Sequence, residues 1–450
     1  MQYLWGAIYM YTECEQMKKA SVMINSLCIF TNLKEDNVLK KYKTLLKYLN
    51  KKEISIEKGI RLYNNFAYEL LNKAGETSFK KYIIDMVFLD NNPFTSMIDH
   101  ENLNNKHIIK QVKHELRALE YIASITSEEL KKTIIHKGKA KNFEVEVINV
   151  LIDFEVDSDE NYDSYKAIDK LKLNILSCDN WGDSLDNIIE FYKQYGTGIF
   201  GEYRAFVWEH IEEKTYLRGI EEPDPVTLKD LVGYEDQKET IIDNTKQFLS
   251  GHPANNLLLY GSRGTGKSST VKAIINEYYT DGLRLIEVDK DKLVDFTKII
   301  RILKNKNLKF IIFVDDLVFE EGEASYSALK TILEGGVESN SSNMLIYATT
   351  NRRHLVKETF SERSGDDVHA SDSIEEKLSL SDRFGITVSF YSPDQKEYLS
   401  IIDGIVESRG LEVNIEYLHA EALKWVRWNN ARSPRTAKQF INWFEGNLKK

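Results

Sequence analysis

A glycine-rich stretch that ends in a lysine and a serine has the spacing needed for phosphate chemistry. Residues 261–268 read GSRGTGKS and match the pattern G-x-x-x-x-G-K-[ST]. Glycines let backbone N–H groups turn inward around phosphate oxygens, where a Cβ would block the approach. Lys267 can then reach the β- and γ-phosphates, and Ser268 can hold Mg²⁺. The alternative is an ordinary glycine turn in a lysine-rich chain.

The residues on either side of this stretch favour phosphate binding. Four apolar residues, 257–260, predict a buried strand before the turn, and Val271, Ala273 and Ile274 predict a helix after it. A helix N-terminus places a positive dipole end beside the phosphates. Strand, loop and helix together predict a nucleotide site. Its expected loop contacts are Gly261, Ser262, Arg263, Gly264, Thr265, Gly266, Lys267, Ser268 and Ser269.

Two carboxylates follow a second apolar run. Residues 310–314 (FIIFV) lead directly into Asp315 and Asp316. The carboxyl edge of a parallel sheet is where ligands bind. Asp315 can hold Mg²⁺ directly or through water, and Asp316 can polarise an attacking water as a base or by orientation. A strand that simply ends in solvent is the alternative, but the position after a phosphate loop favours a metal site of Ser268 and Asp315.

An asparagine and an arginine flank two further predicted strands. Asn351 follows residues 344–349, where its amide can hydrogen-bond the water or the γ-phosphate; a turn residue is the alternative. Arg383 lies in SDRFG, residues 381–385, before the last predicted strand. An arginine at this place can act across a subunit boundary on a neighbouring γ-phosphate, whereas a surface salt bridge is the ordinary alternative.

The last predicted helix opens with Ser433, Pro434 and Arg435. Serine is a favoured N-cap and proline is favoured at the first helical position. Arg435 therefore falls in the first turn, where a cation opposes the helix dipole. This placement is tolerable if Arg435 faces an anion, either a triphosphate or a nearby carboxylate.

The elements that must position these residues divide the chain into four parts. Residues 1–218 predict a mainly α-helical N-terminal domain, with an ambiguous stretch at 143–154 that fits a strand or a buried helix. Residues 219–226 contain two prolines and predict a linker. Residues 227–392 alternate short apolar strands with helices, which predicts a parallel sheet covered on both faces. Residues 393–450 return to helix, with Trp428 and Trp443 expected in a small core.

The predicted boundaries of these elements follow from periodicity. The N-terminal helices are expected at 37–49, 56–72 and 106–125, the strands at 257–260, 283–289, 310–315, 344–349 and 386–391, and the C-terminal helices at 395–408, 415–428 and 434–449.

Composition limits the class of protein. The 450 residues carry a formal net charge of −10, which disfavours a protein whose main task is to coat nucleic acid. The three cysteines are far apart and form no metal motif, which is typical of reduced thiols. The sequence shows neither the order of a secretory signal nor a long apolar run. A cytoplasmic protein without a membrane span is expected.

The motifs GSRGTGKS, FIIFVDD, ATTN, SDRFG and SPRTAKQF, in this order, resemble those of the AAA+ ATPases. They resemble the Walker A loop, Walker B strand, sensor 1, arginine-finger box and sensor 2. The resemblance is closest to a family of bacterial ATP-binding proteins of unknown function, near the replication-initiator and helicase-loader branch. It implies an αβα sandwich with a five-stranded parallel sheet and a helical lid, binding ATP and Mg²⁺ as an oligomer.

The same resemblance assigns residues to the site. The segment LVGY at 231–234 resembles the segment that packs on adenine, which implies contacts from Val232 and Gly233. The resemblance also implies catalytic positions, at Asp316, Asn351, Arg383 and Arg435. Residues 1–218 resemble no family that would identify their partner, so we expect them to select an unknown protein.

One departure concerns Asp316, because most hydrolytic AAA+ proteins have glutamate at this position. The shorter side chain favours a slow, switch-like ATPase that couples ATP hydrolysis to assembly and to remodelling or loading of a macromolecular partner. A scaffold that binds ATP with little turnover is one alternative. A DNA-associated initiator- or loader-like factor is the other, motivated by the basic cluster Arg352, Arg353, His354 and Lys357, which equally fits a nucleotide-facing or intersubunit patch.

Overall fold

The chain forms two compact units, Met1–Glu202 and Tyr203–Lys450. The computed structural model describes residues 15–74, 78–100, 103–155, 167–211, 214–319, 323–334, 342–352, 380, 382–429 and 431–448. The sequence had placed the end of the helical part at residue 218. Strand β1 (Ala205–Ile211) lies before this position and β2 (Lys214–Gly219) spans it, and both belong to the second unit, which begins at Tyr203.

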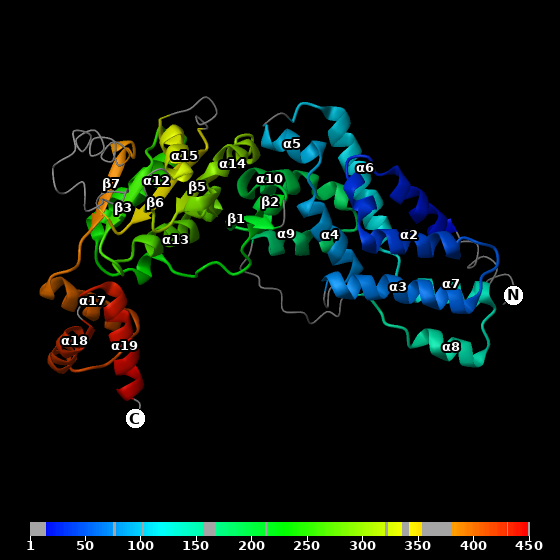
Figure 1. The fold of residues 1–450 in the computed structure, drawn as a ribbon. Coiled ribbons are helices and arrows are strands. Elements are labelled where there is room, and N and C mark those ends of the chain that lie inside the picture. Colours follow the sequence, from blue (N-terminus) through cyan, green and yellow to red (C-terminus); the bar gives the residue numbers. More distant parts are fainter. Residues whose placement is uncertain are drawn as a thin grey trace. The chain divides into compact units, whose positions relative to one another are not determined.

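The described part of the first unit is helical around an aromatic core. Tyr42, Phe66 and Phe79 lie within ring-centroid distances of 4.6–5.1 Å of one another and are buried. The ambiguous stretch at 143–154 begins with a helix, α8 (Asn142–Asn149), rather than a strand. The elements are η1 (Thr31–Glu35), α2 (Asn37–Leu49), α3 (Ile56–Ala74), α4 (Phe79–Leu89), α5 (Pro93–Asp99), α6 (Lys106–Ala123), α7 (Ser127–Gly138), α8, α9 (Ala167–Leu176), η2 (Trp181–Ser184), α10 (Leu185–Tyr195) and α11 (Ile199–Glu202) (Figure 1).

The second unit is built on a seven-stranded sheet with the order β2-β1-β4-β5-β6-β3-β7. Only the β1–β2 pair is antiparallel among the described strands; the other neighbours are parallel. The α/β class is as predicted, whereas the expected count of five strands was wrong because β1 and β2 extend the sheet beyond β4. The remaining strands are β3 (Leu257–Gly261), β4 (Leu283–Glu287), β5 (Lys309–Val314), β6 (Met344–Thr350) and β7 (Ile386–Phe390).

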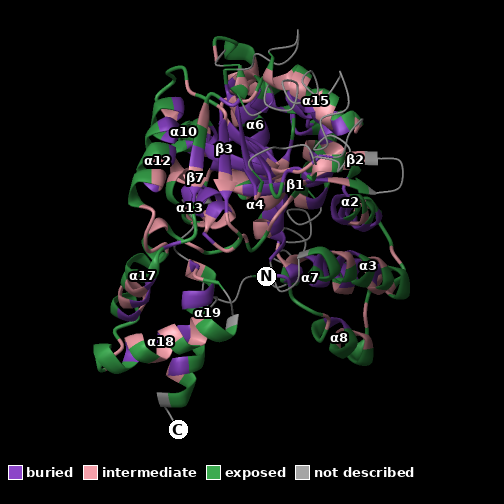
Figure 2. Ribbon diagram, turned by 60° about the vertical axis from the view of Figure 1, so that its left-hand side comes forward, coloured by how far each residue is buried: buried purple, intermediate pink, exposed green. Residues whose placement is uncertain are grey.

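Helices cover the sheet, and its central strands β3, β4, β5 and β6 are buried on both faces (Figure 2). Leu257, Leu259 and their same-face neighbours pack against α12 and α13, while the alternating Leu258 is buried on the opposite face. Burial on both faces is why these strands read as continuous apolar runs. The helical elements here are η3 (Leu228–Asp230), α12 (Glu235–Leu249), α13 (Lys267–Tyr278), η4 (Tyr279–Asp281), η5 (Lys290–Asp295), α14 (Phe296–Leu303) and α15 (Ala324–Leu333).

Three C-terminal helices form a separate small core after β7. They are α17 (Gln395–Ser408), α18 (Ile415–Asn429) and α19 (Pro434–Leu448). Tyr398, Phe440 and Phe444 are buried at its centre. The expectation that Trp428 fills this core was wrong: it lies in the last turn of α18 with 80% of its surface exposed, and Trp443 is 44% exposed. Aromatic residues of α17 and α19 fill the space instead.

Candidate nucleotide site

The glycine loop turns out of β3 with backbone angles that require glycine. Gly261 has a φ of 144°, and a Cβ built on it would lie 1.9 Å from the carbonyl oxygen of Phe390 in β7. Next to it, the N–H of Ser262 donates to the same oxygen at 3.0 Å. Gly264 and Gly266 also have positive φ, and Gly266 is the N-cap of α13. The loop therefore opens at the carboxyl edge of the sheet, at a helix N-terminus.

We expect Gly261→Ala to lower the free energy of unfolding by about 3 kcal/mol or more, since backbone must move to admit the Cβ. Gly251→Ala is the matched control, because Gly251 has a φ of 79° but a Cβ there would meet nothing within 4 Å. Its loss should be about 1–2 kcal/mol, from the left-handed backbone alone. Denaturant unfolding measures both variants, and equal losses would contradict the proposed clash.

Lys267 is held inside the loop by three oxygen acceptors. Its Nζ donates to the carbonyl oxygens of Gly261 at 2.9 Å and Ser262 at 2.8 Å, and to Oδ1 of Asn351 at 2.9 Å. Burial lowers the pKa of the Lys267 ammonium, while the charges of Asp315 and Asp316 act in the opposite direction. The lysine is thus desolvated and tied back to the loop and to Asn351.

The two aspartates after β5 meet the loop from the neighbouring side. Ser268 Oγ donates to Asp315 Oδ1 at 2.6 Å, and the Thr349 hydroxyl donates to the same oxygen. Asn351 Nδ2 donates to Asp316 Oδ1 at 2.7 Å. A hydroxyl and a carboxylate oxygen at this separation form the hard-oxygen set that Mg²⁺ prefers, so these residues fit the ion. Among the described residues, no group of three or more His, Cys, Asp or Glu side chains is arranged to hold a metal by itself.

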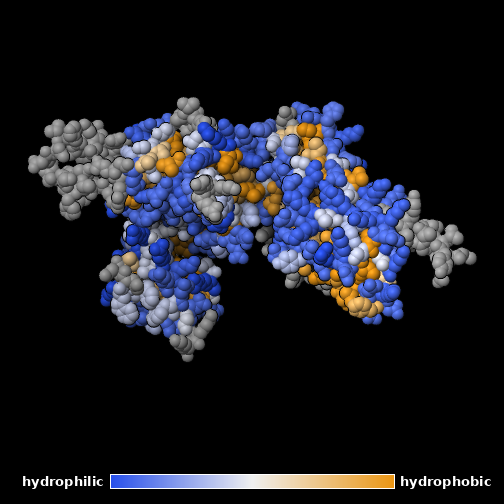
Figure 3. Space-filling model, turned by 45° about the vertical axis from the view of Figure 1, so that its right-hand side comes forward, coloured by the Kyte–Doolittle hydropathy of each residue, from blue (hydrophilic) through white to orange (hydrophobic). Residues whose placement is uncertain are grey.

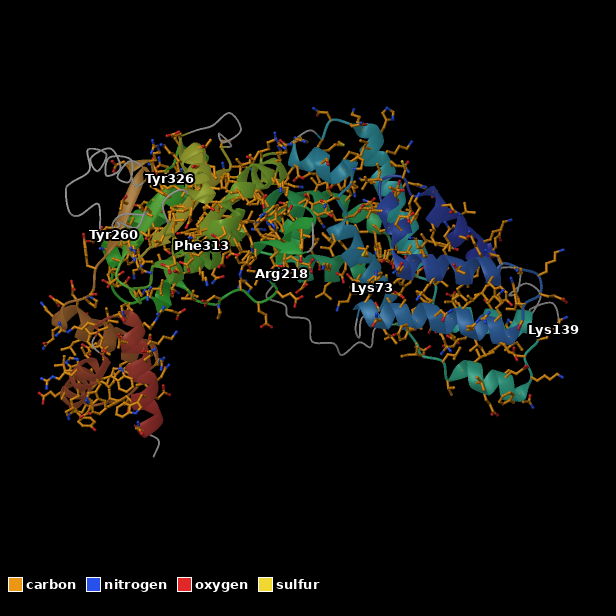
Figure 4. All side chains as sticks on the ribbon, in the orientation of Figure 1. Lys73, Lys139, Arg218, Tyr260, Phe313 and Tyr326 are labelled. Carbon is orange, nitrogen blue, oxygen red and sulfur yellow. The ribbon has the colours of Figure 1, made fainter. Side chains whose placement is uncertain are left out.

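Asn351 connects the lysine to the second aspartate. Its carbonyl oxygen accepts from Lys267 and its amide nitrogen donates to Asp316, so one side chain spans both charges. Asn351 directly follows strand β6, and it lies between the loop and Asp316 because β6 lies between β3 and β5 in the sheet. Figure 4 labels Tyr260 and Phe313, which mark the ends of β3 and β5 near this point.

The C-terminal helices close the other side of the loop. The backbone N–H of Arg435 donates to the carbonyl oxygen of Gly264 at 3.2 Å. Ser433 caps α19, since its Oγ accepts from the N–H of Thr436 at 3.1 Å. Arg435 is thereby placed in the first turn of α19, next to the loop.

A cavity of about 980 Å³ lies between these elements, large enough for a nucleotide. The predicted site residues in its wall are Val232, Gly233, Arg263, Gly264, Thr265, Gly266, Lys267, Ser268, Ser269, Asp315, Asp316, Asn351 and Arg435. Gly261 and Ser262 lie behind the wall and hold Lys267 through their carbonyl oxygens.

Val232 and Gly233 line the end of the cavity next to α17. A Cβ on Gly404 would lie 2.5 Å from Val232 Cγ1, and one on Gly233 would lie 3.2 Å from Ile401 Cγ1. These close approaches bring the segment before α12 directly against the C-terminal helices. The result is an apolar end to a cavity whose other end is charged, as a nucleoside phosphate requires.

Arg383 stands apart from this cavity. It precedes β7, at the amino edge of the sheet, whereas the site lies at the carboxyl edge. The five residues of β7 span about 17 Å at about 3.3 Å per residue. Arg383 instead pairs with Glu334 at 2.6 Å. The chain does not bring this arginine to its own loop.

Several lining residues escaped the sequence interpretation. Thr349, Arg409 and Lys438 all contribute to the cavity wall. Thr349 stands two residues before Asn351 on a strand, and this spacing places both on one face. Arg409 had no signal in the sequence, because it follows α17, which packs against Val232 and Gly233 through a contact between residues remote in sequence. Of the basic cluster, Arg352 is exposed, and Arg353, His354 and Lys357 lie outside the described residues.

Strand order and site together define the class of protein. From β7 through β3, β6 and β5 to β4, the parallel strands and the helical lid over the loop are those of an AAA+ P-loop protein. More narrowly, the chain belongs to the family described as Protein of unknown function (DUF815), whose model matches residues 201–448.

Shorter stretches of the chain are similar to curated proteins. It is 35% identical over 71 residues to the replication factor C large subunit of Methanococcus maripaludis, covering 16% of this chain and 15% of that protein. It is 39% identical over 72 residues to the ORC1-type DNA replication protein 14 of Haloarcula marismortui, covering 15% and 17%. It is 42% identical over 82 residues to the ATP-dependent zinc metalloprotease FtsH of Aquifex aeolicus, covering 16% and 12%. The chain thus spans less than a fifth of each of these relatives.

One solved structure with a likeness to this fold is AMPPCP-bound DnaA from Aquifex aeolicus. The match covers 50% of this chain and 66% of that chain at 20% identity, with a TM-score of 0.35. Within the described ranges, no helix has both the length and the apolar character to span a bilayer.

Proposed function

We propose that this protein is a slow AAA+ ATPase that converts ATP and water to ADP and phosphate, and that this turnover drives assembly and the remodelling or loading of a partner. The observation that carries the proposal is the convergence of Ser268, Asp315, Asp316 and Asn351 beside Lys267. These side chains come from the ends of two neighbouring strands, β5 and β6, and from helix α13 after the loop. Such a set offers a metal site, a base and a cation at one phosphate position.

Each residue has a separate task in this proposal. The loop N–H groups bind the phosphates, and Lys267 holds the γ-phosphate once it leaves its carbonyl acceptors. Ser268 and Asp315 would hold Mg²⁺, which supplies charge neutralisation at the β- and γ-phosphate oxygens. Asp316 orients the water and accepts its proton, while Asn351 fixes the Asp316 carboxylate through a 2.7 Å hydrogen bond.

Assembly follows from the place of Arg383. Arg383 cannot reach the glycine loop of its own chain, because the length of β7 separates them. We therefore assign Arg383 to the nucleotide of a neighbouring subunit. The ion pair with Glu334 holds the guanidinium in the free chain. A subunit interface that brings it to a triphosphate would complete the site in trans.

The helical N-terminal unit is where we place partner selection. Four apolar residues around α8 are exposed: Phe143 by 73%, Val147 by 36%, Val150 by 82% and Ile152 by 48%. Hydrophobic surface is visible at the lower edge of this unit in Figure 3, where α8 lies. Clustered exposed apolar side chains favour a protein contact. We place the protein in the cytoplasm, since Cys28 and Cys178 are free thiols.

A second candidate is a scaffold that binds ATP with little turnover. The short side chain of Asp316 and its hydrogen bond to Asn351 favour it, because both restrict the reach of the base. A DNA-associated role has less support, because the net charge is −10.

Turnover by Asp316→Ala separates the two candidates. For an ATPase, the rate should fall by about 100-fold or more while ATP affinity stays, since the base acts only in the chemical step. Phosphate release measures the rate, and Asp281→Ala, at an exposed aspartate outside the cavity wall, is the matched control. An unchanged, near-zero rate in both the parent and Asp316→Ala would favour the scaffold.

A further inference from the structure

The second aspartate has an unusual backbone. Asp316 has a φ of 49°, in the left-handed region that side chains with a Cβ rarely adopt. Aspartate is among the residues that tolerate this region best, which is a physical reason for aspartate rather than the longer glutamate at position 316. A left-handed residue persists only where its surroundings hold it. The restraint on Asp316 is therefore part of how the site works.

That restraint comes from Thr349 on the adjacent strand β6. The hydroxyl of Thr349 accepts from the N–H of Asp316 at 2.9 Å and donates to the Asp315 carboxylate. Its carbonyl oxygen accepts from the N–H of Leu317 at 2.7 Å. Thr349 is 2% exposed and lies beyond the register pair Val314–Ala348, so the sheet fixes it opposite the turn. Thr349 thus makes hydrogen bonds to three consecutive residues, Asp315, Asp316 and Leu317.

We propose that Thr349 is a positioning residue, whose hydroxyl keeps Asp316 in the left-handed turn that points its carboxylate toward Asn351 and the γ-phosphate position. It acts through Asp316 and need not touch the nucleotide's reacting atoms. The effect on hydrolysis rests on the proposed ATPase function, whereas the effect on the backbone of Asp316 does not. Without the hydroxyl, the N–H of Asp316 loses its acceptor at 2.9 Å and keeps only the longer contact to Asp315 Oδ1 at 3.2 Å, within the same turn.

Thr349→Val removes the hydroxyl and keeps the size and the backbone carbonyl. We expect the amide of Asp316 in full-length protein to exchange with deuterium about tenfold faster or more, because it loses the shorter of its two hydrogen bonds and keeps only the one to Asp315 Oδ1 at 3.2 Å. The amide of Leu317 should keep its protection, and Thr349→Ser should match the parent. Residue-resolved mass spectrometry measures both amides. Unchanged exchange at Asp316, or equal loss at Leu317, would overturn the proposal.

A second experiment measures the effect of Thr349→Val on ATP hydrolysis. In Thr349→Val we expect kcat to fall about tenfold or more with KM for ATP unchanged within about threefold, because misplacing the base affects only the chemical step. Thr349→Ser should restore kcat. Thr350→Val is the matched control, since Thr350 is a buried neighbour that accepts from Arg352 and is not part of the cavity wall. An unchanged kcat in Thr349→Val, or a Thr349→Ser as slow as Thr349→Val, would overturn the proposal. If the parent shows no turnover, the proposed ATPase function fails, and amide exchange alone decides the role of Thr349.

Discussion

Replacing Arg383 by alanine should leave ATP bound and lower its hydrolysis by about 100-fold or more, the range expected of an arginine that neutralises γ-phosphate charge. Binding should persist because Arg383 lies outside the cavity wall, at the opposite edge of the sheet. Phosphate release and the affinity for a non-hydrolysable ATP analogue measure the two quantities. Equal losses of affinity and rate would contradict the assignment.

Mixing two inactive variants tests whether this arginine acts in trans. Asp316→Ala keeps Arg383 but lacks the base, and Arg383→Ala keeps the base but lacks the arginine. In a mixed assembly, an Arg383→Ala subunit with an intact base can lie beside an Asp316→Ala subunit with an intact arginine, so ATP hydrolysis should return. If the arginine acts on the nucleotide of its own subunit, the mixture should stay inactive. Glu334→Gln is the matched control, because it breaks the 2.6 Å ion pair and keeps Arg383. A loss of rate in Glu334→Gln equal to that in Arg383→Ala would indicate that only the pair matters.

Lys267→Ala should weaken ATP binding by about 100-fold or more, which corresponds to about 2.7 kcal/mol. The ammonium of Lys267 is a half-buried cation in the cavity wall next to the loop, and alanine leaves no donor in its place. Calorimetry with the analogue and Mg²⁺ measures the affinity. Lys272→Ala removes a lysine from the same helix outside the cavity wall and should bind as the parent does.

The loss at Lys267 must be separated from damage to the loop. Lys267 also donates to Gly261 and Ser262, so its removal frees two carbonyl oxygens. Thermal unfolding without nucleotide distinguishes the two effects. A variant that binds ATP normally would refute the assignment of Lys267, and one that melts far below the parent would call for Lys267→Gln, which retains a donor.

Local sequence was enough to predict the elements whose pattern is strong. Helix α2 begins and ends where the periodicity of residues 37–49 placed it, and the five predicted strands all occur within two residues of their expected ends. The strands β1 and β2 were missed because AFVWEHI interrupts its apolar residues with a glutamate and a histidine. Their pairing with β4 is a long-range contact that no local pattern contains.

The candidate site was likewise predictable from the sequence only in part. The loop, Asp315 and Asn351 follow directly from motifs, and the structure brings them into one cavity. Trp428 was placed wrongly because hydrophobicity predicts burial only on average, and which helix face is covered depends on partners remote in sequence. Thr349 was overlooked because its importance lies in the turn of Asp316, and a left-handed backbone at an aspartate leaves no mark in the sequence.

The β1–β2 hairpin bears on how this chain is organised as modules. The family match begins at residue 201, shortly before β1, and ends at 448. The hairpin is thus inherited with the nucleotide-binding part, as its pairing with β4 demands, since an unpaired β4 edge would invite association with other chains. The boundary at which the helical N-terminal unit could be replaced by another domain therefore lies before β1. A different helical unit joined before residue 203 would leave every strand of the sheet paired as it is now.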